Sequence, residues 1–528
     1  MKLTELLTDN VNGAAWEAKG YQLPRFDIKA VREKTYREPT WVHFGGGNIF
    51  RAFPAAILND ALNTGKYDRG VIVAETFDYE VIDKAYTPYG NLSLLVSLQS
   101  DGNIEKKVIA SVTEALKADP QFDDWQRLVE IFRNPSLQMI SFTITEKGYT
   151  YNDADLSRGL SPVLAMGKVC ALLYERYKAG KLPLTVQSMD NCSHNGGRVK
   201  AGVLAYAERW VNNGLVPADF ADYLRNKSKV TFPWSMIDKI TPRPHEKVKE
   251  LLEADGFEDN NYIETEKHTF TAPFVNAEEV QYLVIEDDYT NGRPPLDLGG
   301  ALYTTRETVD KVETMKVTTC LNPLHTAMSI YGCMLGYTLI SAEMKDEDLR
   351  AFIQKIGYME AMPVVTDPGV LNPYEFIGAV INRRLPNPFM PDAPQRIASD
   401  TSQKLPIRFG ETIKKYVRRH LDMKNLVLIP LTLAGYARYL KGLKDDLTAF
   451  EPSPDPMLAE LQAIVAPLEI GKPDQDWSPL RQLYSRKDVF GLDLYEAGLG
   501  EQIEGYVKEL YAGPGAVRKT LHKYVQAR

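Results

Sequence analysis

The sequence predicts an α/β protein, in which an N-terminal, Rossmann-type doubly wound sheet is followed by a mainly α-helical C-terminal domain. Three observations predict this fold. Short apolar runs alternate with helical patterns through the first half of the chain. The glycine turn GGGN (45–48) joins the first buried strand to a helix. Long segments of helical apolar periodicity fill the second half, with few strand-like runs between them.

Length and loop composition predict two domains. A chain of 528 residues exceeds what one hydrophobic core usually holds. The segment NGRPPLDLGG (291–300) is rich in Gly and Pro, which is typical of a connection. We therefore expect a nucleotide-binding domain at 1–295 and a helical catalytic domain at 296–528.

The composition excludes several classes of protein. The net charge of −8 argues against nucleic acid as the main partner, because a duplex favours clustered Lys and Arg. No apolar run approaches the ~20 residues that span a membrane, and the N-terminus does not resemble a signal peptide. The four cysteines form no CxxC pair, so neither a structural zinc site nor a disulfide framework is expected. We expect a soluble, cytoplasmic protein without a metal.

The elements follow in order along the chain. Residues 1–39 form a polar lead-in, expected to lie over the surface. A helix is expected at 161–180, between the last two strands of the first half. The predicted strands are TWVHF (40–44), RGVIVAE (69–75), NLSLLVSLQ (91–99), KVIASVTEAL (107–116), LQMISFTITEKGY (137–149) and LPLTVQSMDN (182–191). The helices predicted in the second half span 323–341, 345–357, 372–382, 409–421, 427–443 and 456–467.

The glycine turn is the candidate cofactor site. Gly45 and Gly47 match the first two glycines of the dinucleotide fingerprint, where they permit a tight turn and close approach of a pyrophosphate. Phe50 stands in place of the third glycine, so the motif alone also fits an ordinary glycine turn. The strand before the turn and the helix after it favour the dinucleotide. Asn48 belongs to the same turn, and Arg51 could approach a phosphate or form a surface ion pair.

An acid ends the second predicted strand. Glu75 can accept hydrogen bonds from the ribose hydroxyls and repel a 2′-phosphate, which favours NAD over NADP. Its neighbour Asp78 competes for this role.

Three polar residues near 320 are the candidate chemical site. Lys316, Asn322 and His325 can together move a proton, hold an oxygen and orient a substrate without metal. Lysine suits the role of base when burial lowers its pKa, and an apolar helix follows Lys316. Taken alone, such a triple is more often a set of helix caps and solvated side chains.

Two further segments carry polar groups that could contact a substrate. Asn191 follows a predicted parallel strand, at the sheet edge where α/β proteins bind ligands, although an Asx turn is the alternative. Arg396, Lys404 and Arg408 lie in RIASDTSQKLPIRF (396–409) and could grip a carboxylate. A solvated loop of mixed charge is the alternative there.

Several ordered blocks resemble the long-chain mannitol dehydrogenase family, which includes polyol dehydrogenases and fructuronate and tagaturonate reductases. The resemblance covers about residues 40–440. Its blocks are GGGNIFRAF (45–53), TEKGY (145–149), SMDNCSHNGG (188–197), FPWSMIDKITP (232–242), VIEDD (284–288) and ETMKVTTCLNPLH (313–325).

The resemblance implies a Rossmann-type domain, a helical domain and an active site between them, with NAD, no metal and often a monomeric state; a small homo-oligomer stays open. It implies that Lys316 is the catalytic lysine. Asn191 and Asn322 would hold the reacting oxygen, and His325 would be the active-site histidine. The remaining roles that it implies are a gate for proton exit at Glu313 and substrate binding at Asp238 and Arg396, to which the residue pattern adds Lys404.

The chain departs from the family pattern at one point. The family reads KxxxxNGSH, whereas here Asn322 stands six residues after Lys316 and Pro323-Leu324 replaces Gly-Ser. One extra residue must be absorbed before the helix, or Lys316 is rotated by roughly 100°. The resemblance implies an open-chain sugar acid or polyol as substrate, with D-fructuronate and D-mannonate as the expected pair. Mannitol 2-dehydrogenase and tagaturonate reductase are the alternatives, and a nucleotide-binding protein without catalysis is a more distant one.

Overall fold

The computed structural model describes residues 1–8 and 12–527. The chain divides into two compact units. Unit 1 comprises Met1–Gln99 and Asn103–Asp310, and unit 2 comprises Lys311–Arg528 and Ser100–Gly102.

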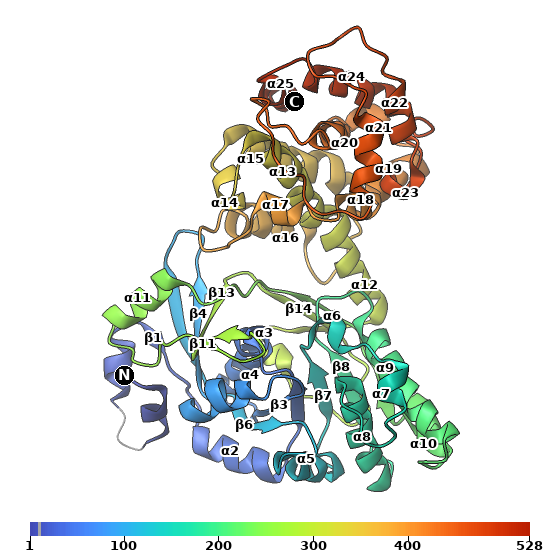
Figure 1. The fold of residues 1–528 in the computed structure, drawn as a ribbon. Coiled ribbons are helices and arrows are strands. Elements are labelled where there is room, and N and C mark those ends of the chain that lie inside the picture. The colour runs from blue at the N-terminus through green and yellow to red at the C-terminus, as the bar shows by residue number, and fades with distance from the viewer. Residues whose placement is uncertain (9–11, 528) are drawn as a thin grey trace. The chain divides into compact units, whose positions relative to one another are not determined.

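Unit 1 is built on a six-stranded parallel sheet (Figure 1). Its strands lie in the order β6-β3-β2-β7-β8-β9, so the chain starts in the middle, winds to one edge, and then winds to the other. This is the Rossmann order, and it confirms the predicted doubly wound fold. The strands are β2 (Trp41–Phe44), β3 (Val71–Glu75), β6 (Val112–Lys117), β7 (Met139–Phe142), β8 (Leu184–Ser188) and β9 (Val230–Thr231).

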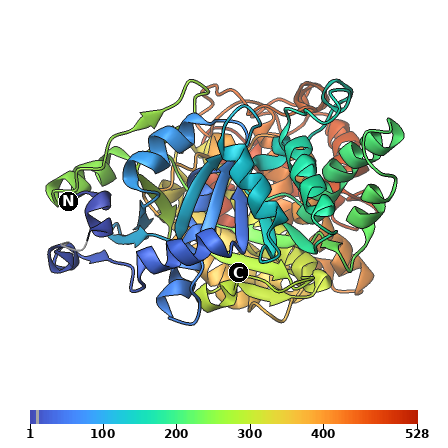
Figure 2. The ribbon, with the colours of Figure 1, turned by 90° about the horizontal axis from the view of Figure 1, so that it is seen from below.

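Each face of this sheet is covered by its own apolar core, and Figure 2 shows the blue and teal strands with helices on both sides. Alternate residues of one strand face opposite ways, so Phe44 joins one core and Trp41 the other. The first core includes side chains of α5 (Asp124–Arg133), α8 (Ala165–Lys178), α9 (Asn195–Asn212) and α10 (Asp219–Arg225). The second includes side chains of α2 (Ile28–Arg37), α3 (Asn48–Ala52) and α4 (Pro54–Asn63).

Smaller sheets complete unit 1. One has the order β1-β5-β4-β13, from β1 (Tyr21–Gln22), β5 (Ile104–Ile109), β4 (Ser93–Leu98) and β13 (Phe274–Glu278). A second joins β10 (Ser235–Asp238), β14 (Tyr282–Glu286) and β15 (Leu302–Thr304). A hairpin pairs β11 (Ile263–Glu264) with β12 (Phe270–Thr271). The remaining helices of unit 1 are α1 (Gly13–Glu17), α6 (Thr145–Gly148), α7 (Asp153–Leu156) and α11 (Glu246–Ala254).

The single strand predicted at 107–116 is wrong, because the chain changes sheets within it. β5 pairs with β4, whereas β6 pairs with β3 in the large sheet. The change is fixed at Ala110 and Ser111 by the helix beneath: the Ala110 N–H donates to Asn59 Oδ1 at 2.9 Å, and Ser111 Oγ donates to the Ala55 carbonyl at 2.7 Å. The apolar alternation continues through this corner, so the sequence pattern hid it.

The lead-in at 1–39 is more ordered than expected. It forms α1, β1 and α2, and it buries Trp16, Tyr21 and Val31. Trp16 and Tyr21 meet edge to face, with ring centroids 5.2 Å apart. The expectation of a polar surface segment was therefore wrong for these residues.

Unit 2 is helical, as predicted. All six segments expected to be helical contain a helix. The chain enters it through α12 (Arg306–Met315). The helices that follow are α13 (Asn322–Leu335), α14 (Ile340–Glu343), α15 (Glu347–Lys355), α16 (Pro373–Ala379), α17 (Pro394–Ile397), α18 (Thr401–Leu405), α19 (Glu411–Arg418), α20 (Leu428–Tyr439), α21 (Leu458–Val465), α22 (Ser478–Tyr484), α23 (Lys487–Phe490), α24 (Gly500–Leu510) and α25 (Ala516–Gln526).

Wide, π-helical turns punctuate unit 2. They lie at Lys316–Cys320, Ile356–Ala361, Val380–Arg384 and Pro406–Gly410. Such a turn holds one residue more than an α-helical turn, and it often marks a functional position. Across the described part of the chain, no helix is both long enough and apolar enough to cross a membrane.

Candidate functional site

A cavity of about 530 Å³ lies in unit 1 at the carboxyl ends of the central strands. Its lining includes the residues that follow β2, β3 and β7, together with the start of α8. The strand order reverses between β2 and β7, and such a switch point is where open α/β sheets bind ligands. The volume is within the range of cofactor pockets, roughly 300–1,000 Å³.

Gly45 and Gly47 of the glycine turn after β2 line this cavity. Gly45 has a φ of +103°, and a Cβ there would lie 2.4 Å from the Thr143 carbonyl oxygen, so only glycine fits. Gly47 has ordinary backbone angles, and a Cβ there would meet no other atom within 4 Å. Gly45 therefore serves the turn itself, whereas Gly47 keeps open the space above it.

Glu75 lies at the end of β3 and also lines the cavity. Its Oε2 accepts the Gly46 N–H at 2.8 Å, which fixes the glycine turn. Its Oε1 accepts the N–H groups of Thr76, Phe77 and Asp78, at 2.9, 3.0 and 3.3 Å. The carboxylate thus positions two loops at once, a task that the sequence did not reveal, and its contact with a ribose stays a prediction.

The other residues predicted around the turn lie beneath it. Phe50 is buried and stacks on His43, with ring centroids 4.2 Å apart. Arg51 is also buried; it donates to the Ala272 carbonyl at 2.7 Å and to Asn48 Oδ1 at 2.8 Å. Burial lowers the pKa of Arg51. In this arrangement Arg51 ties α3 to the segment after β12, and neither a surface ion pair nor a phosphate is needed to explain it.

The loop after β8 carries Asn191, whose side chain is exposed. Hydrogen bonds from residues before and after it hold the loop in place. Asp190 accepts the Ile144 N–H at 2.9 Å and the Thr145 N–H at 3.1 Å, which links the ends of β7 and β8. Asn195 donates to the Asp190 carbonyl at 2.9 Å. Asp190 and Asn195 were not predicted as site residues, although both stand in the block SMDNCSHNGG.

Asp238 is the last residue of β10 and is buried. The same strand is joined to the Asn191 loop through Asn195, which donates to the Ser235 carbonyl and accepts the Ser235 N–H, each at 3.0 Å. The loop and the strand that carries Asp238 therefore form one hydrogen-bonded frame in unit 1.

In unit 2, Lys316 is buried and opens a π-helical turn. The Leu321 N–H donates to the Lys316 carbonyl at 3.1 Å, five residues back. A π-helical turn holds one residue more than an α-helical turn, so this turn can accommodate the extra residue between Lys316 and Asn322. Glu313 lies three residues before Lys316 on α12, at the spacing of neighbours on one helix face.

The first turn of α13 is fixed by Arg408. This helix starts at Asn322, and Pro323 lies in its first turn, as predicted. The Arg408 guanidinium donates to Thr326 Oγ1 and, at 3.5 Å, to the Asn322 carbonyl. Burial lowers the pKa of Arg408 to about 10. Arg408 thus braces the backbone that carries Asn322 and His325.

His325 is nearly buried and is held neutral. Burial lowers its pKa to about 4; Asp392 opposes that shift, while Arg408 and Arg384 reinforce it. His325 Nε2 lies 3.9 Å from Asp392 Oδ2 and has no hydrogen-bond partner among the residues that the structure describes. A neutral imidazole with a free nitrogen can donate to or accept from a substrate hydroxyl, according to its tautomer.

The basic segment lies in the same unit. Arg396 is 65% exposed and pairs with Asp392, the carboxylate beside His325. Lys404 is half-buried and donates to the Ile397 carbonyl at 3.0 Å and to the Ser399 carbonyl. Burial, with the Arg408 charge adding to it, lowers the pKa of Lys404. Arg396, Lys404 and Arg408 therefore lie in one short segment of unit 2, with Asp392, Asp400 and Asp455 acting on its charges.

The predicted residues are divided between the units. Unit 1 carries the glycine turn, Asn191 and Asp238, whereas unit 2 carries Lys316, Asn322 and His325. The sequence revealed the position of Arg408 in a basic segment, but not its contact with α13.

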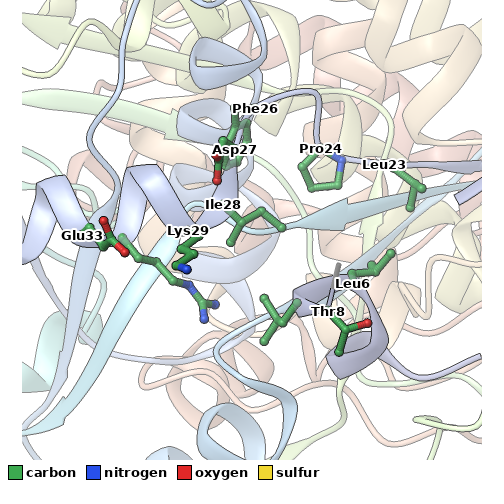
Figure 3. Close-up of a pocket in the computed structure, with 11 residues that line it drawn as sticks. Leu6, Thr8, Leu23, Pro24, Phe26, Asp27, Ile28, Lys29 and Glu33 are labelled. Carbon is green, nitrogen blue, oxygen red and sulfur yellow. The ribbon is translucent and has the colours of Figure 1, made fainter. Parts of the chain in front are cut away.

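A second hollow, of about 410 Å³, lies at the lead-in segment (Figure 3). It is lined by residues from 6–8 and 23–33, and none of the predicted site residues is among those described there. Apolar side chains such as Phe26 and Ile28 stand beside charged ones such as Lys29 and Glu33.

Two protein-family models match most of the chain. The mannitol dehydrogenase Rossmann domain matches residues 39–298, and the mannitol dehydrogenase C-terminal domain matches residues 308–511. The chain is 53% identical to the D-mannonate oxidoreductase of Thermotoga maritima, over 97% of each chain. It is 29% identical to the mannitol 2-dehydrogenase of Cereibacter sphaeroides, over 83% of this chain and 87% of that protein.

Solved structures show the same architecture. A substrate-free D-sorbitol dehydrogenase superposes with a TM-score of 0.78 at 25% identity, covering 94% of this chain and 97% of its own. The Pseudomonas fluorescens mannitol 2-dehydrogenase, in a ternary complex with NAD and D-mannitol, shares this fold, with a TM-score of 0.67 at 24% identity. It covers 96% of this chain and 97% of its own. With both domain models matched in order, the chain belongs to the mannitol dehydrogenase family of oxidoreductases.

Proposed function

We propose that this oxidoreductase is a fructuronate reductase, which interconverts D-fructuronate and D-mannonate with NAD as cofactor. The observation that carries the proposal is the 53% identity to a D-mannonate oxidoreductase over nearly the full length of both chains. The basic segment of unit 2 supports an acidic substrate, since a uronate carries a carboxylate that a polyol lacks.

The residues of unit 1 fit a dinucleotide. Gly47 leaves open space above the turn, and the first N–H groups of a helix lack partners within it, so α3 offers donors for a pyrophosphate. Gly45, Gly47 and Asn48 would hold that group, with Phe50 and Arg51 supporting the turn from below. Glu75 and Asp78 place negative charge where a 2′-phosphate would lie, which favours NAD over NADP. When bound, the cofactor supplies or accepts the hydride.

The chain itself supplies the acid–base chemistry. We assign Lys316 as the group that gives a proton to the carbonyl oxygen during reduction and removes it during oxidation. Asn322 and Asn191 would donate hydrogen bonds to that oxygen as negative charge develops on it. His325, neutral in the pH range around 7, would orient the adjacent hydroxyl. Glu313 would pass the proton between Lys316 and solvent.

The substrate carboxylate would bind the basic segment. Arg396 is the exposed cation of that segment and can exchange its Asp392 partner for a substrate carboxylate. Lys404 offers a second cation, and Asp238 would accept from substrate hydroxyls. Because a neutral polyol gains little from these cations, they favour the sugar acid.

Substrate choice can be measured directly. NADH oxidation at 340 nm would be followed with D-fructuronate, D-tagaturonate and D-fructose in parallel. We expect kcat/KM for D-fructuronate to exceed that for D-fructose by at least 100-fold. A preference for D-fructose would instead identify a mannitol 2-dehydrogenase, the activity named for the 29% identical relative, and a preference for D-tagaturonate would identify the other uronate reductase.

A lack of turnover with NADH and NADPH on every substrate, together with intact nucleotide binding, would favour a non-catalytic role. The cytoplasmic location, and a monomer or small homo-oligomer as the working state, remain predictions that fractionation and light scattering would test.

A further inference from the structure

An exposed aromatic ring stands at the wall of the unit 1 cavity. Phe77 is 66% exposed and lines the cavity two residues after Glu75. Single exposed apolar side chains are common on protein surfaces. Phe77 differs because it faces a cavity whose other lining includes a second exposed apolar side chain, Val163, at 50% exposure.

The ring is held in place from one side. Lys267 Nζ lies 4.0 Å from the Phe77 ring centroid and donates to the Phe77 carbonyl at 2.5 Å. Lys267 belongs to the turn between β11 and β12, and that turn is itself anchored, because Thr265 Oγ1 donates to Asp78 Oδ2 at 2.6 Å. The ammonium thus covers one face of the ring and ties it to a fixed hairpin.

The order of the residues along the cavity wall indicates which part of the cofactor would contact the other face of the Phe77 ring. A dinucleotide at a Rossmann switch point places its pyrophosphate at the glycine turn and its adenosine ribose at the end of the second strand. Here these places are Gly47 and Glu75. The adenine then lies beyond Glu75, where the chain reaches Phe77.

We propose that Phe77 is the platform on which the adenine ring stacks, and that Lys267 is the positioning residue that holds the platform. This inference rests on the proposed use of NAD. A base stacked on an aromatic ring contributes roughly 1–3 kcal/mol to binding, so the loss of the ring is measurable.

The test is NADH binding, followed by the fluorescence of the reduced nicotinamide. Phe77→Ala is expected to raise the Kd for NADH about tenfold. The same variant should bind reduced nicotinamide mononucleotide, which lacks the adenosine half, as the wild type does. Phe77→Tyr should restore the wild-type Kd for NADH.

Tyr36→Ala is the matched control. Tyr36 is 57% exposed and has Arg127 over its ring at 3.9 Å, yet it lines a different groove. It should leave the Kd for NADH unchanged. Lys267→Met should raise the Kd for NADH and for NADPH by the same, smaller factor; an effect confined to NADPH would show that Lys267 reads a phosphate and not the ring.

The outcomes separate the two proposals. If wild-type protein binds NADH and Phe77→Ala binds it equally well, the platform is refuted while the proposed function stands. An equal loss of NADH and mononucleotide binding would also refute it, because the damage would then not be confined to the adenine. If the wild type binds no NADH, the proposed cofactor fails and the platform fails with it.

Discussion

The glycine turn of unit 1 (45–48) and the lysine turn of unit 2 (316–320) are built by different means. At the glycine turn the backbone decides the geometry: Gly45 has a positive φ that other residues rarely adopt, and Glu75 clamps the amide of Gly46. At the lysine turn a side chain sits on a widened helix, and a distant residue, Arg408, braces the helix that follows.

This difference teaches where each site is vulnerable. The glycine turn depends on residues without side chains, so adding a single Cβ there should damage it. The lysine turn depends on the register between Lys316 and Asn322, so a change in residue count should damage it more than a change in side-chain size. Four predictions test this contrast.

The largest effect is expected from the reacting group itself. Lys316→Ala should lower kcat by about 10³-fold, because a general acid–base group typically contributes 10²- to 10⁴-fold. NADH binding should not change, since the glycine turn that is proposed to hold the cofactor lies in the other unit. Steady-state kinetics and NADH titration would measure both. Lys345→Ala, at an exposed lysine of unit 2, is the control; equal turnover of wild type and Lys316→Ala would remove the lysine from the mechanism.

Inserting one residue into the wide turn should act almost as strongly. An alanine inserted after Val317 would exceed the one extra residue that the π turn accommodates, and it should rotate Lys316 by roughly 100° relative to α13. We expect kcat to fall by about 10²-fold, in the range that the loss of a positioned group produces. Far-UV circular dichroism and NADH affinity should stay near wild type. Retention of full activity would show that the register of this turn does not position Lys316.

Alanine should have different effects at the two glycines: at Gly45 it should lower stability, and at Gly47 it should weaken NADH binding. Gly45→Ala should destabilise unit 1 by about 2 kcal/mol or more, since the new Cβ meets the Thr143 carbonyl and φ is positive. Gly47→Ala should leave the urea midpoint unchanged and yet raise the Kd for NADH about tenfold, because its Cβ would enter the space above the turn. A Gly47→Ala variant with wild-type affinity would contradict a cofactor at this turn.

A pH effect is expected at His325. The folded pKa of His325, about 4, lies below its unfolded value near 6.5, so the neutral form is the one that folding favours. This stabilisation is complete above pH 6.5 and is lost as the pH falls toward 4. Between pH 7 and pH 4.5, His325 should reduce the free energy of unfolding by about 2 kcal/mol.

His325→Asn should lack this part of the pH dependence. Urea unfolding of both proteins at several pH values would measure the difference. Parallel curves for wild type and variant would mean that the imidazole is not kept neutral by burial.

Much of the fold could be predicted because it follows from apolar patterning. The strands predicted at 40–44 and 69–75 are mostly apolar, and their core segments β2 and β3 are buried along their whole length. The corner at Ala110 was missed because its cause lies in Asn59, a residue of another element. Patterning reports which side of an element is buried, and not which sheet a strand joins.

The site residues likewise divide into those whose local structure could be predicted and those whose contacts could not. The positive φ of Gly45 could be anticipated, because the glycine turn follows a strand and precedes a helix. The hydrogen bonds of Glu75 to backbone amides could not be predicted, because any residue can supply a backbone N–H. Nor could the contact of Arg408 with α13, which joins residues 82 positions apart.

The wide turn at Lys316 has a consequence for how this gene can be compared with others. An inserted codon in the middle of a helix would shift every later side chain around the helix axis. A π turn confines that shift to a few residues of backbone, so the side chains of the following helix keep their orientation about the helix axis. An alignment of this chain with relatives of the five-residue spacing should therefore open its gap within residues 317–321 and nowhere else along the helix.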